Sequence, residues 1–263
     1  MTFDWDAFAS QVISPDQLII NGLLLTVSIA IVSQTIGVVL GVFAALGRLS
    51  RHRWSRIVAG IYIWIFRGTP LLVQIALFYF GLGAAHVFDW PDIKFLGFTI
   101  SGAIQAGIFA LGVNEGAYMA EIVRAGIISI DPGQMEAARS LGMTYGKAMR
   151  RIVLPQAARV IVPPLGNEFN NMLKTTSLLF VIGINELYNT FVIKQGLNFL
   201  PFEMYLACAL WFLLLTTIWT IIQAYIERRL ARGTGTTTQS GPGVLGRLMG
   251  FRSTESGTPV VAH

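Results

Sequence analysis

The sequence has little charge and almost no cysteine. Charged residues make up 13% of the chain, about half the share of a typical soluble domain. The one cysteine, Cys208, excludes an intrachain disulfide, and its apolar neighbours favour a packing role. The three histidines, His52, His86 and His263, are too scattered for a metal site or a catalytic triad. We therefore predict no metal ligands and no catalytic residues.

The N-terminal region also lacks the features of a secretory signal. Residues 1–17 contain three aspartates and no basic residue, and the first hydrophobic stretch is too long for the apolar part of a signal peptide. We expect residues 1–17 to form an extracytoplasmic or interfacial segment, with Phe3, Trp5 and Phe8 at the depth of the lipid headgroups.

Apolar residues, in contrast, are abundant: 54% of the 263 residues are hydrophobic and the mean hydropathy is +0.61. An apolar helix needs about 20 residues to cross a bilayer, and several segments reach that length. The predicted fold class is all-α, a polytopic membrane protein with five transmembrane helices. The predicted spans are 18–47, 57–83, 98–123, 161–183 and 205–226.

Two of these spans contain helix-breaking residues. Gly68-Thr69-Pro70 interrupts the second span, and Pro163-Pro164 lies at the start of the fourth, where we expect an irregular path. The spans define a transmembrane domain over residues 18–229, with a loop over about 128–155 between the third and fourth spans. Residues 230–263 have little to bury and are predicted to be a disordered tail.

The distribution of basic residues predicts the orientation. Most of the 19 Lys and Arg residues fall in the loop after the first span, the loop after the third span and the tail. Such segments are cytoplasmic by the positive-inside rule. An odd number of spans then places the N-terminus outside and the C-terminus in the cytoplasm. Because the basic residues are spread over three loops, we expect no nucleic-acid partner.

Four charged residues fall inside the predicted spans: Arg67, Glu115, Glu168 and Lys174. A charge at membrane depth costs a few kcal/mol, so each should face a polar cavity or a partner. Two positive and two negative groups at similar depth suit a zwitterionic amino acid. Alternatively, these charges pair with one another and only hold the helices together.

Polar residues of the fourth span share a face. Spacings of three and four residues align Glu168 with Asn171 and Thr175 on a helix. The predicted substrate-binding residues are therefore Arg67, Glu115, Glu168, Asn171, Lys174 and Thr175. Two acids among them favour a substrate with a cationic or amide side chain.

The loop before the fourth span starts as a short capped helix. Asp131 is placed to accept the first free N–H groups, Pro132 occupies a position where its missing N–H costs nothing, and Gln134 completes a pattern like a capping box. Gly142 suits the left-handed position that ends a helix. This is an amphipathic surface helix suited to contact a partner.

The second half of the loop, after Gly142, is also expected to be helical. Thr144 is expected to cap a second set of turns, and Pro155 to close it. The loop also contains Glu136-Ala137-Ala138, then Gly142 six residues after Glu136, then Ile152, Leu154 and Pro155. This spacing resembles the EAA loop of binding-protein-dependent ATP-binding-cassette (ABC) importers, which implies a cytoplasmic coupling helix that docks on a separate ATPase subunit. An ordinary interfacial helix is the alternative. The coupling residues implied by the resemblance are Glu136, Ala137, Ala138, Gly142, Ile152, Leu154 and Pro155.

Five stretches of the sequence resemble the polar amino-acid permease branch of these importers. The resemblance as a whole covers about residues 21–229. The resemblance implies a type I importer permease of the bacterial inner membrane that dimerises with itself or a paralogue. It also implies two cytoplasmic ATPase subunits and an extracytoplasmic substrate-binding protein. Thr175 departs from the branch, which more commonly has an acid there. The stretches are FRGTPLLVQ, GAYMAEIVRAGI, GQMEAARSLG, LPQAARVIVPPLGNEF and LKTTSL.

The chain shows no nucleotide site of its own. Gly146-Lys147 is followed by Ala148 and lacks a phosphate-binding glycine loop, so we expect no cofactor on this chain and ATP use on a partner. Two rival functions are an ion-coupled carrier, with Glu115 or Glu168 as its ion site, and a membrane scaffold. Carriers usually have paired broken helices in repeated halves, and this sequence has one break.

Overall fold

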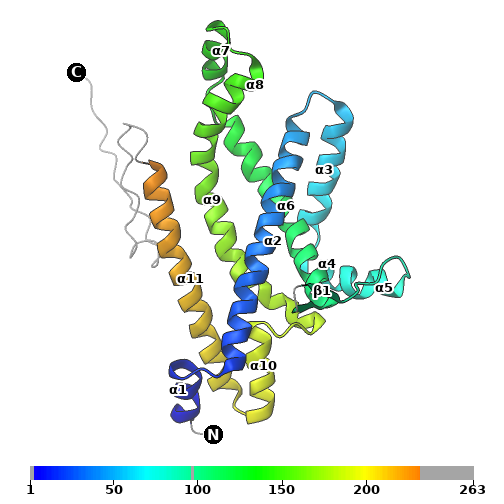
Figure 1. Cartoon of the computed structure of the whole chain (residues 1–263), viewed down its shortest axis with the longest axis vertical. Helices are drawn as coiled ribbons and strands as arrows, with labels where there is room; N and C mark the ends of the chain where they lie inside the picture. Colours follow the sequence, from blue (N-terminus) through cyan, green and yellow to red (C-terminus); the bar gives the residue numbers. More distant parts are fainter. Residues whose placement is uncertain (1–2, 96–97, 232–263) are drawn as a thin grey trace, which may run out of the picture.

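A computed structural model describes residues 3–95 and 98–231 of the chain. Four long helices run along the molecule: α2 (Gln17–Leu49), α6 (Gly102–Ile128), α9 (Leu154–Thr175) and α11 (Pro201–Ala231). Figure 1 shows α1 (Trp5–Ile13) and α10 (Leu187–Asn198) at one end. The opposite end carries α7 (Pro132–Ser140) and α8 (Tyr145–Ala148).

The second predicted span is a bent pair of helices. Helix α3 (Arg53–Gly68) is followed by α4 (Leu71–Ala76), a π-helical turn (Leu77–Gly81) and α5 (Leu82–Ala84). The axes of the two parts differ by 104° across the break. The predicted break at Gly68-Thr69-Pro70 is therefore confirmed.

The helices account for a polytopic membrane protein. By length and apolar composition α2 and α11 can cross a membrane, and up to four spans result if the two bent pairs each count as one. Helix α6 occupies the position of the predicted third span. It is 27 residues long, about 40 Å at 1.5 Å per residue. Most of α6 is buried among the other helices, so its sequence does not need the uniformly apolar surface that lipid demands.

Helices α2 and α6 pack through glycines. A Cβ atom added at Gly37 of α2 would lie 3.3 Å from the carbonyl oxygen of Gly112 of α6, and one added at Gly116 would lie 3.4 Å from that of Gly37. A Cβ atom added at Gly41 would collide with the Cβ of Met119 and lie 2.9 Å from its backbone carbon. Small residues at such a contact let membrane helices approach closely.

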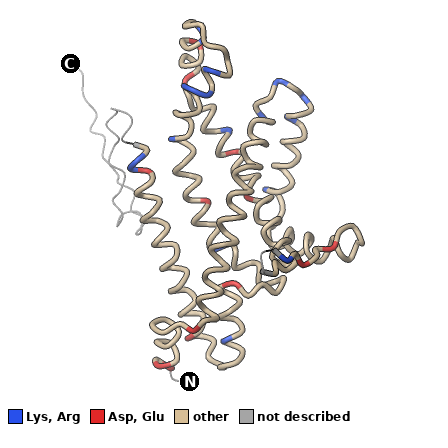
Figure 2. Tube along the Cα trace, in the orientation of Figure 1, with Lys and Arg blue, Asp and Glu red and all other residues tan. Residues whose placement is uncertain are grey.

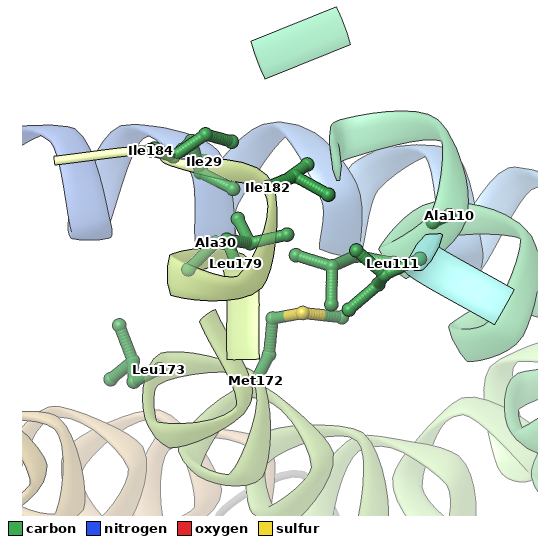
Figure 3. Close-up of a cluster of buried hydrophobic side chains, with 10 residues drawn as sticks. Ile29, Ala30, Ala110, Leu111, Met172, Leu173, Leu179, Ile182 and Ile184 are labelled. Atoms are coloured by element: carbon green, nitrogen blue, oxygen red, sulfur yellow. The ribbon is translucent and has the colours of Figure 1, made fainter. Parts of the chain in front are cut away.

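The main core lies where α2, α6 and the end of the fourth predicted span meet. Figure 3 shows Ile29 and Ala30 of α2 beside Leu111 of α6 and Met172 of α9. Leu179, from the 3₁₀ segment Thr176–Ile182 that follows α9, fills the centre. A second core lies between α2, α10 and α11 and includes the buried Cys208, which confirms its packing role.

A short hairpin departs from the predicted all-helical fold. Strands β1 (Ile93–Phe95) and β2 (Phe98–Ile100) pair antiparallel, with Ile93 opposite Ile100. The third predicted span was expected to begin at Phe98, but helix α6 begins at Gly102. Ser101 caps it by accepting from the backbone N–H of Ile104. An apolar strand and an apolar helix start look alike over so few residues.

Prolines before and at the start of the fourth predicted span do not interrupt the helix. Pro155 was expected to close a set of turns, but the π-helical stretch Met149–Val153 leads directly into α9. Pro155 is the second residue of α9 and directly follows this π-helical stretch. Pro163 and Pro164 lie inside α9, so the expected irregular path is not seen as a break there.

Charge is distributed unevenly between the two ends. Figure 2 shows Lys and Arg gathered at the end that carries α7, α8 and the turn between α2 and α3, and at the end of α11. Acidic residues gather at the opposite end, around α1 and α10. The folded chain thus keeps the charge asymmetry on which the predicted orientation depends.

Candidate functional site

A polar cavity, which we call the chamber, lies between the break that separates α3 from α4 and helices α6 and α9. Its volume is about 580 Å³, and Thr69, Pro70 and Leu71 of the break form part of its wall. The remaining wall combines apolar residues with a group of polar ones. The polar residues from α6 and α9 are Asn114, Glu115, Glu168, Asn171, Lys174 and Thr175.

The chamber brings together five of the six predicted substrate residues. Arg67 is the exception: its side chain is exposed, and its guanidinium carbon lies 5.2 Å from the ring centroid of Tyr118. Tyr118 itself lines the chamber. Arg67 therefore lies behind the chamber wall, next to the Tyr118 ring, and is not part of the lining.

Glu115 is held in the wall by a residue that the sequence did not reveal. It is 6% exposed and accepts a hydrogen bond of 2.9 Å from Nε2 of Gln34, itself buried in α2. A polar residue in the apolar α2 segment was the available signal. This bond satisfies one oxygen of a carboxylate that would otherwise be costly at such depth.

The chamber charges do not form ion pairs with one another. Ion pairs elsewhere join Arg124 to Glu121 and Lys194 to Asp16. Arg67, Glu115, Glu168 and Lys174 take part in neither. The alternative in which these four charges clamp the helices to each other is therefore not seen in the described residues.

Two amide side chains complete the backbone at the helix break. Gln74 Nε2 donates to the carbonyl oxygens of Phe66 (3.0 Å) and Thr69 (3.1 Å) and to Oγ1 of Thr69 (2.7 Å). Asn114 Nδ2 donates to the same Phe66 oxygen (2.9 Å) and to Oε1 of Gln74 (3.0 Å). Non-helical backbone at membrane depth requires such partners. The sequence reasoning missed both residues, although Gln74 follows the break by one helical turn.

The projecting loop has the predicted caps, with one exception at its start. Asp131 Oδ1 accepts from the backbone N–H of Gly133 (2.8 Å) and Pro132 is the first residue of α7. Gln134 does not close a capping box: its Oε1 accepts from Nε2 of Gln156 (3.3 Å) and links the loop to α9. The local pattern could not reveal a partner 22 residues away.

Helix α7 ends as predicted. Gly142 has a φ of +81°, and the backbone N–H groups of Gly142 and Met143 donate to the carbonyls of Arg139 and Ala138. This is the hydrogen-bond pattern of a Schellman cap. Thr144 precedes α8 but its side chain makes no capping bond, so that predicted cap is wrong.

The predicted coupling residues divide between an exposed face and a packed one. Glu136 and Ala137 are exposed, whereas Ala138 is 1% exposed and packs against the rest of the loop. The predicted coupling residues after Gly142 lie on the same continuous helical segment, Tyr145–Ile182, as the chamber residues of α9. Of these, Ile152 is half-buried, and Leu154 and Pro155 are exposed.

At the opposite end, charged residues that lie between the fourth and fifth predicted spans are buried. Glu186 is fully buried and caps α10, accepting from the N–H groups of Tyr188 (2.9 Å) and Asn189 (2.8 Å). Oγ1 of Thr26 donates to Glu186 (3.4 Å) and accepts from the N–H of Leu187 (3.1 Å). An acid directly before an apolar helix was the available signal for this cap.

Asp16 and Lys194 join the start of α2 to α10. Lys194 is buried and its ammonium donates to the Asp16 carboxylate, which also accepts from the N–H of Ile19 (3.1 Å). Partial burial opposes the charge of Asp16, but the hydrogen bonds from Lys194 and Ile19 outweigh it. The pKa of Asp16 is therefore below its ordinary value.

Fold and chamber together define a helical membrane protein of the permease class. The chain belongs to the family described as binding-protein-dependent transport system inner membrane component, which residues 37–232 match. It is therefore the membrane-spanning component of such a transport system, in the bacterial inner membrane.

Curated relatives cover most of the chain. The arginine transport system permease protein ArgU of Corynebacterium glutamicum is 40% identical over 241 residues, which cover 89% of this chain and 74% of ArgU. The arginine transport system permease protein ArtQ of Bacillus subtilis is 36% identical over 230 residues, which cover 88% of this chain and 98% of ArtQ.

Solved structures agree on the fold. A crystal structure of an amino acid ABC transporter with histidines matches with a TM-score of 0.76 and 40% identity, over 87% of this chain and all of the other. The inward-facing MetNI methionine ABC transporter matches with a TM-score of 0.64 at 19% identity, over 81% of this chain and 96% of the other. This second match concerns the fold alone.

Proposed function

We propose that the chain is the permease subunit of an ATP-driven importer and that its chamber receives a polar amino acid. The observation that carries the proposal is the lining of the chamber. Glu115, Glu168 and Lys174 supply charges of both signs, and Asn171 and Asn114 supply amides, around a cavity of about 580 Å³. A free amino acid needs this combination, because it presents an ammonium and a carboxylate together.

The substrate we propose has a cationic or amide side chain. Glu115 and Glu168 leave one carboxylate for the side chain after the other has bound the α-ammonium, while Lys174 suits the α-carboxylate. The names of the relatives support this choice, since they include two arginine permeases and a probable glutamine permease of Bacillus subtilis.

The loop that carries α7 is the part that we assign to a cytoplasmic ATPase subunit. Glu136 and Ala137 are exposed on a short helix at the basic end of the molecule, and basic ends face the cytoplasm. In this orientation the N-terminus lies outside, and the chamber opens alternately to each side. An extracytoplasmic binding protein, two ATPase subunits and a second permease copy or paralogue complete the transporter.

Uptake by vesicles tests the transport proposal. The complex reconstituted with its ATPase and binding protein should accumulate a labelled cationic or amide amino acid when ATP is supplied and ion gradients are collapsed. Glu168→Gln and Asn171→Ala should reduce that uptake, whereas Gln17→Ala, an exposed site outside the chamber, should not. Uptake that needs an ion gradient but not ATP would instead establish a secondary carrier. An absence of uptake under both conditions would favour a membrane scaffold.

Co-purification tests the docking proposal. Glu136→Lys should reduce the amount of ATPase subunit recovered with the permease, because the side chain is exposed on the contact face that we assign. Asp6→Lys makes the same charge change at the opposite end and should leave recovery unchanged. Equal recovery and equal substrate-stimulated ATP hydrolysis for all three proteins would contradict the assignment of α7.

A further inference from the structure

A second cavity, which we call the arginine groove, lies where α2 meets α3 at the basic end of the molecule. Its volume is about 540 Å³, and it is open to the surface. No residue of the groove takes part in the chamber or in the loop that carries α7. Its lining residues are Arg48, Arg53, Arg56, Ile57, Gly60, Ile61 and Trp64.

The groove is polar at one end and apolar along its length. Its arginines gather around the turn between α2 and α3, while Ile57, Ile61 and Trp64 follow at spacings of four and three residues along one face of α3. These apolar side chains are 36%, 51% and 74% exposed. The lining therefore has the polarity of an amphiphile: a charged head beside an apolar body.

The positive charge of the groove is not neutralised by nearby acids. Residues 17–88 contain no Asp or Glu, and in the neighbouring helix α6 Glu121 is already paired with Arg124. One arginine has a structural role: Arg56 Nη1 donates to the carbonyls of Ser50 and Arg51 and so stabilises the turn between α2 and α3. The other groove arginines, Arg48 and Arg53, are exposed.

Gly60 keeps the groove open. A Cβ atom added there would lie 3.1 Å from Nη1 of Arg48 and otherwise meet no neighbour except the same guanidinium. The floor of the groove is thus bare backbone directly beneath a cation. A larger side chain at Gly60 would fill this space and displace only the flexible end of Arg48.

We propose that the arginine groove binds an anionic phospholipid, with its phosphate on Arg48 and Arg53 and an acyl chain along Ile57, Ile61 and Trp64. Basic pockets at the cytoplasmic ends of membrane helices attract anionic headgroups, and each Lys or Arg adds to the attraction. Zwitterionic lipids have the same apolar body but no net charge, so the groove should discriminate between the two by headgroup. The proposal goes beyond transport and does not depend on the identity of the substrate.

Fluorescence quenching by brominated lipids tests the proposal with the full-length permease in vesicles. Trp64 lies in the groove, and its signal is the difference between the unchanged protein and Trp64→Phe. Brominated phosphatidylglycerol should quench this signal at about tenfold lower content than brominated phosphatidylcholine. Arg48→Gln with Arg53→Gln should remove the preference, and so should Gly60→Leu, which keeps every charge. Arg228→Gln with Arg229→Gln removes the same charge from the end of α11 and should leave the preference intact.

Three outcomes would overturn the proposal. Equal quenching by both lipids would mean that the groove does not bind the anionic headgroup in preference to the zwitterionic one. No quenching by either would mean that protein, such as a second permease copy or the ATPase, covers the groove. Loss of the preference on adding inorganic phosphate would identify a free-anion site in place of a lipid site. Uptake measurements decide the transport proposal separately, because the lipid measurement requires neither substrate nor ATP.

Discussion

Gln74 and Asn114 hydrogen bond to each other and also donate to one shared acceptor, the carbonyl oxygen of Phe66. Phe66 belongs to α3, Gln74 to α4 and Asn114 to α6, so these bonds join both sides of the helix break to each other and to α6. The break therefore has a fixed geometry, and the wall that Thr69 and Pro70 give to the chamber is held in place from within the bundle.

Replacement of Gln74 should loosen this wall. Gln74→Met keeps the length of the side chain but leaves the Thr69 carbonyl oxygen without its donor, which costs about 1–3 kcal/mol for a buried group. We expect a lower melting temperature in detergent and a raised KM for uptake. Gln17→Ala removes an exposed amide bonded within its own helix and should change neither. An unchanged KM for the Gln74→Met protein would show that the geometry of the helix break does not affect substrate binding in the chamber.

Glu115→Gln should separate stability from transport. The new amide can still accept from Gln34, while the cost of a buried charge disappears. The melting temperature should therefore stay the same or rise. Uptake of a cationic amino acid should fall about tenfold, equivalent to ~1.4 kcal/mol. Glu121→Gln alters a partly exposed acid of the same helix and should affect uptake little; a drop of similar size there would weaken the role of Glu115.

Two glycines of the same loop should respond differently to alanine. Gly142 has a φ of +81°, so Gly142→Ala costs about 1 kcal/mol in left-handed strain and should disturb the end of α7. Gly146 lies inside α8 with nothing within 4 Å of an added Cβ, so Gly146→Ala should be neutral or slightly stabilising. We expect substrate-stimulated ATP hydrolysis to fall for Gly142→Ala alone. A loss of equal size in both would point to a sequence requirement in place of a conformational one.

The contact between α2 and α6 predicts a second pair of glycine variants. Gly41→Ala places a Cβ against Met119, and such overpacking costs about 1–3 kcal/mol. Gly196 lies in α10 with no atom within 4 Å of an added Cβ, so Gly196→Ala should leave stability unchanged or raise it. Thermal unfolding of the purified variants measures both. Equal melting temperatures would show that the two helices can move apart at no cost.

The ion pair between Asp16 and Lys194 predicts a loss of stability in acid. The pKa of Asp16 is lower in the folded chain than in the unfolded one, so its contribution is complete above the unfolded value, near 4. That contribution is lost as the pH falls through the folded value. Asp16→Asn keeps a side chain that can cap α2 but cannot titrate. Melting temperature measured against pH should therefore fall less steeply in acid for Asp16→Asn than for the unchanged protein.

Local patterns in the sequence predicted those features that depend on a few adjacent residues. The break at Gly68-Thr69-Pro70 was predictable because proline and glycine act on their own backbone. The left-handed Gly142 was predictable for the same reason. The convergence of Glu168, Asn171 and Thr175 on one wall followed from helical spacing alone.

Features that depend on a distant partner were not predictable in this way. Gln74 and Asn114 are unremarkable in sequence, and only the fold brings them to the same carbonyl. Glu186 and Lys194 lie between two predicted spans, where a charged residue is usually exposed, yet Thr26 and Asp16 supply partners that make their burial tolerable. Pro155 was expected to end a helix, and the π-helical turn before it allows the helix to continue.

The unbroken helical path from Tyr145 to Ile182 makes the end of the molecule that carries α8 and the chamber wall parts of one rigid body. Asn171 lies 26 residues beyond Tyr145, about 40 Å along the axis. A stiff rod of that length turns a small tilt at one end into a displacement of several ångströms at the other. Motion at the α8 end therefore need not pass from side chain to side chain to change the shape of the chamber, and a change in the chamber can move the α8 end in return.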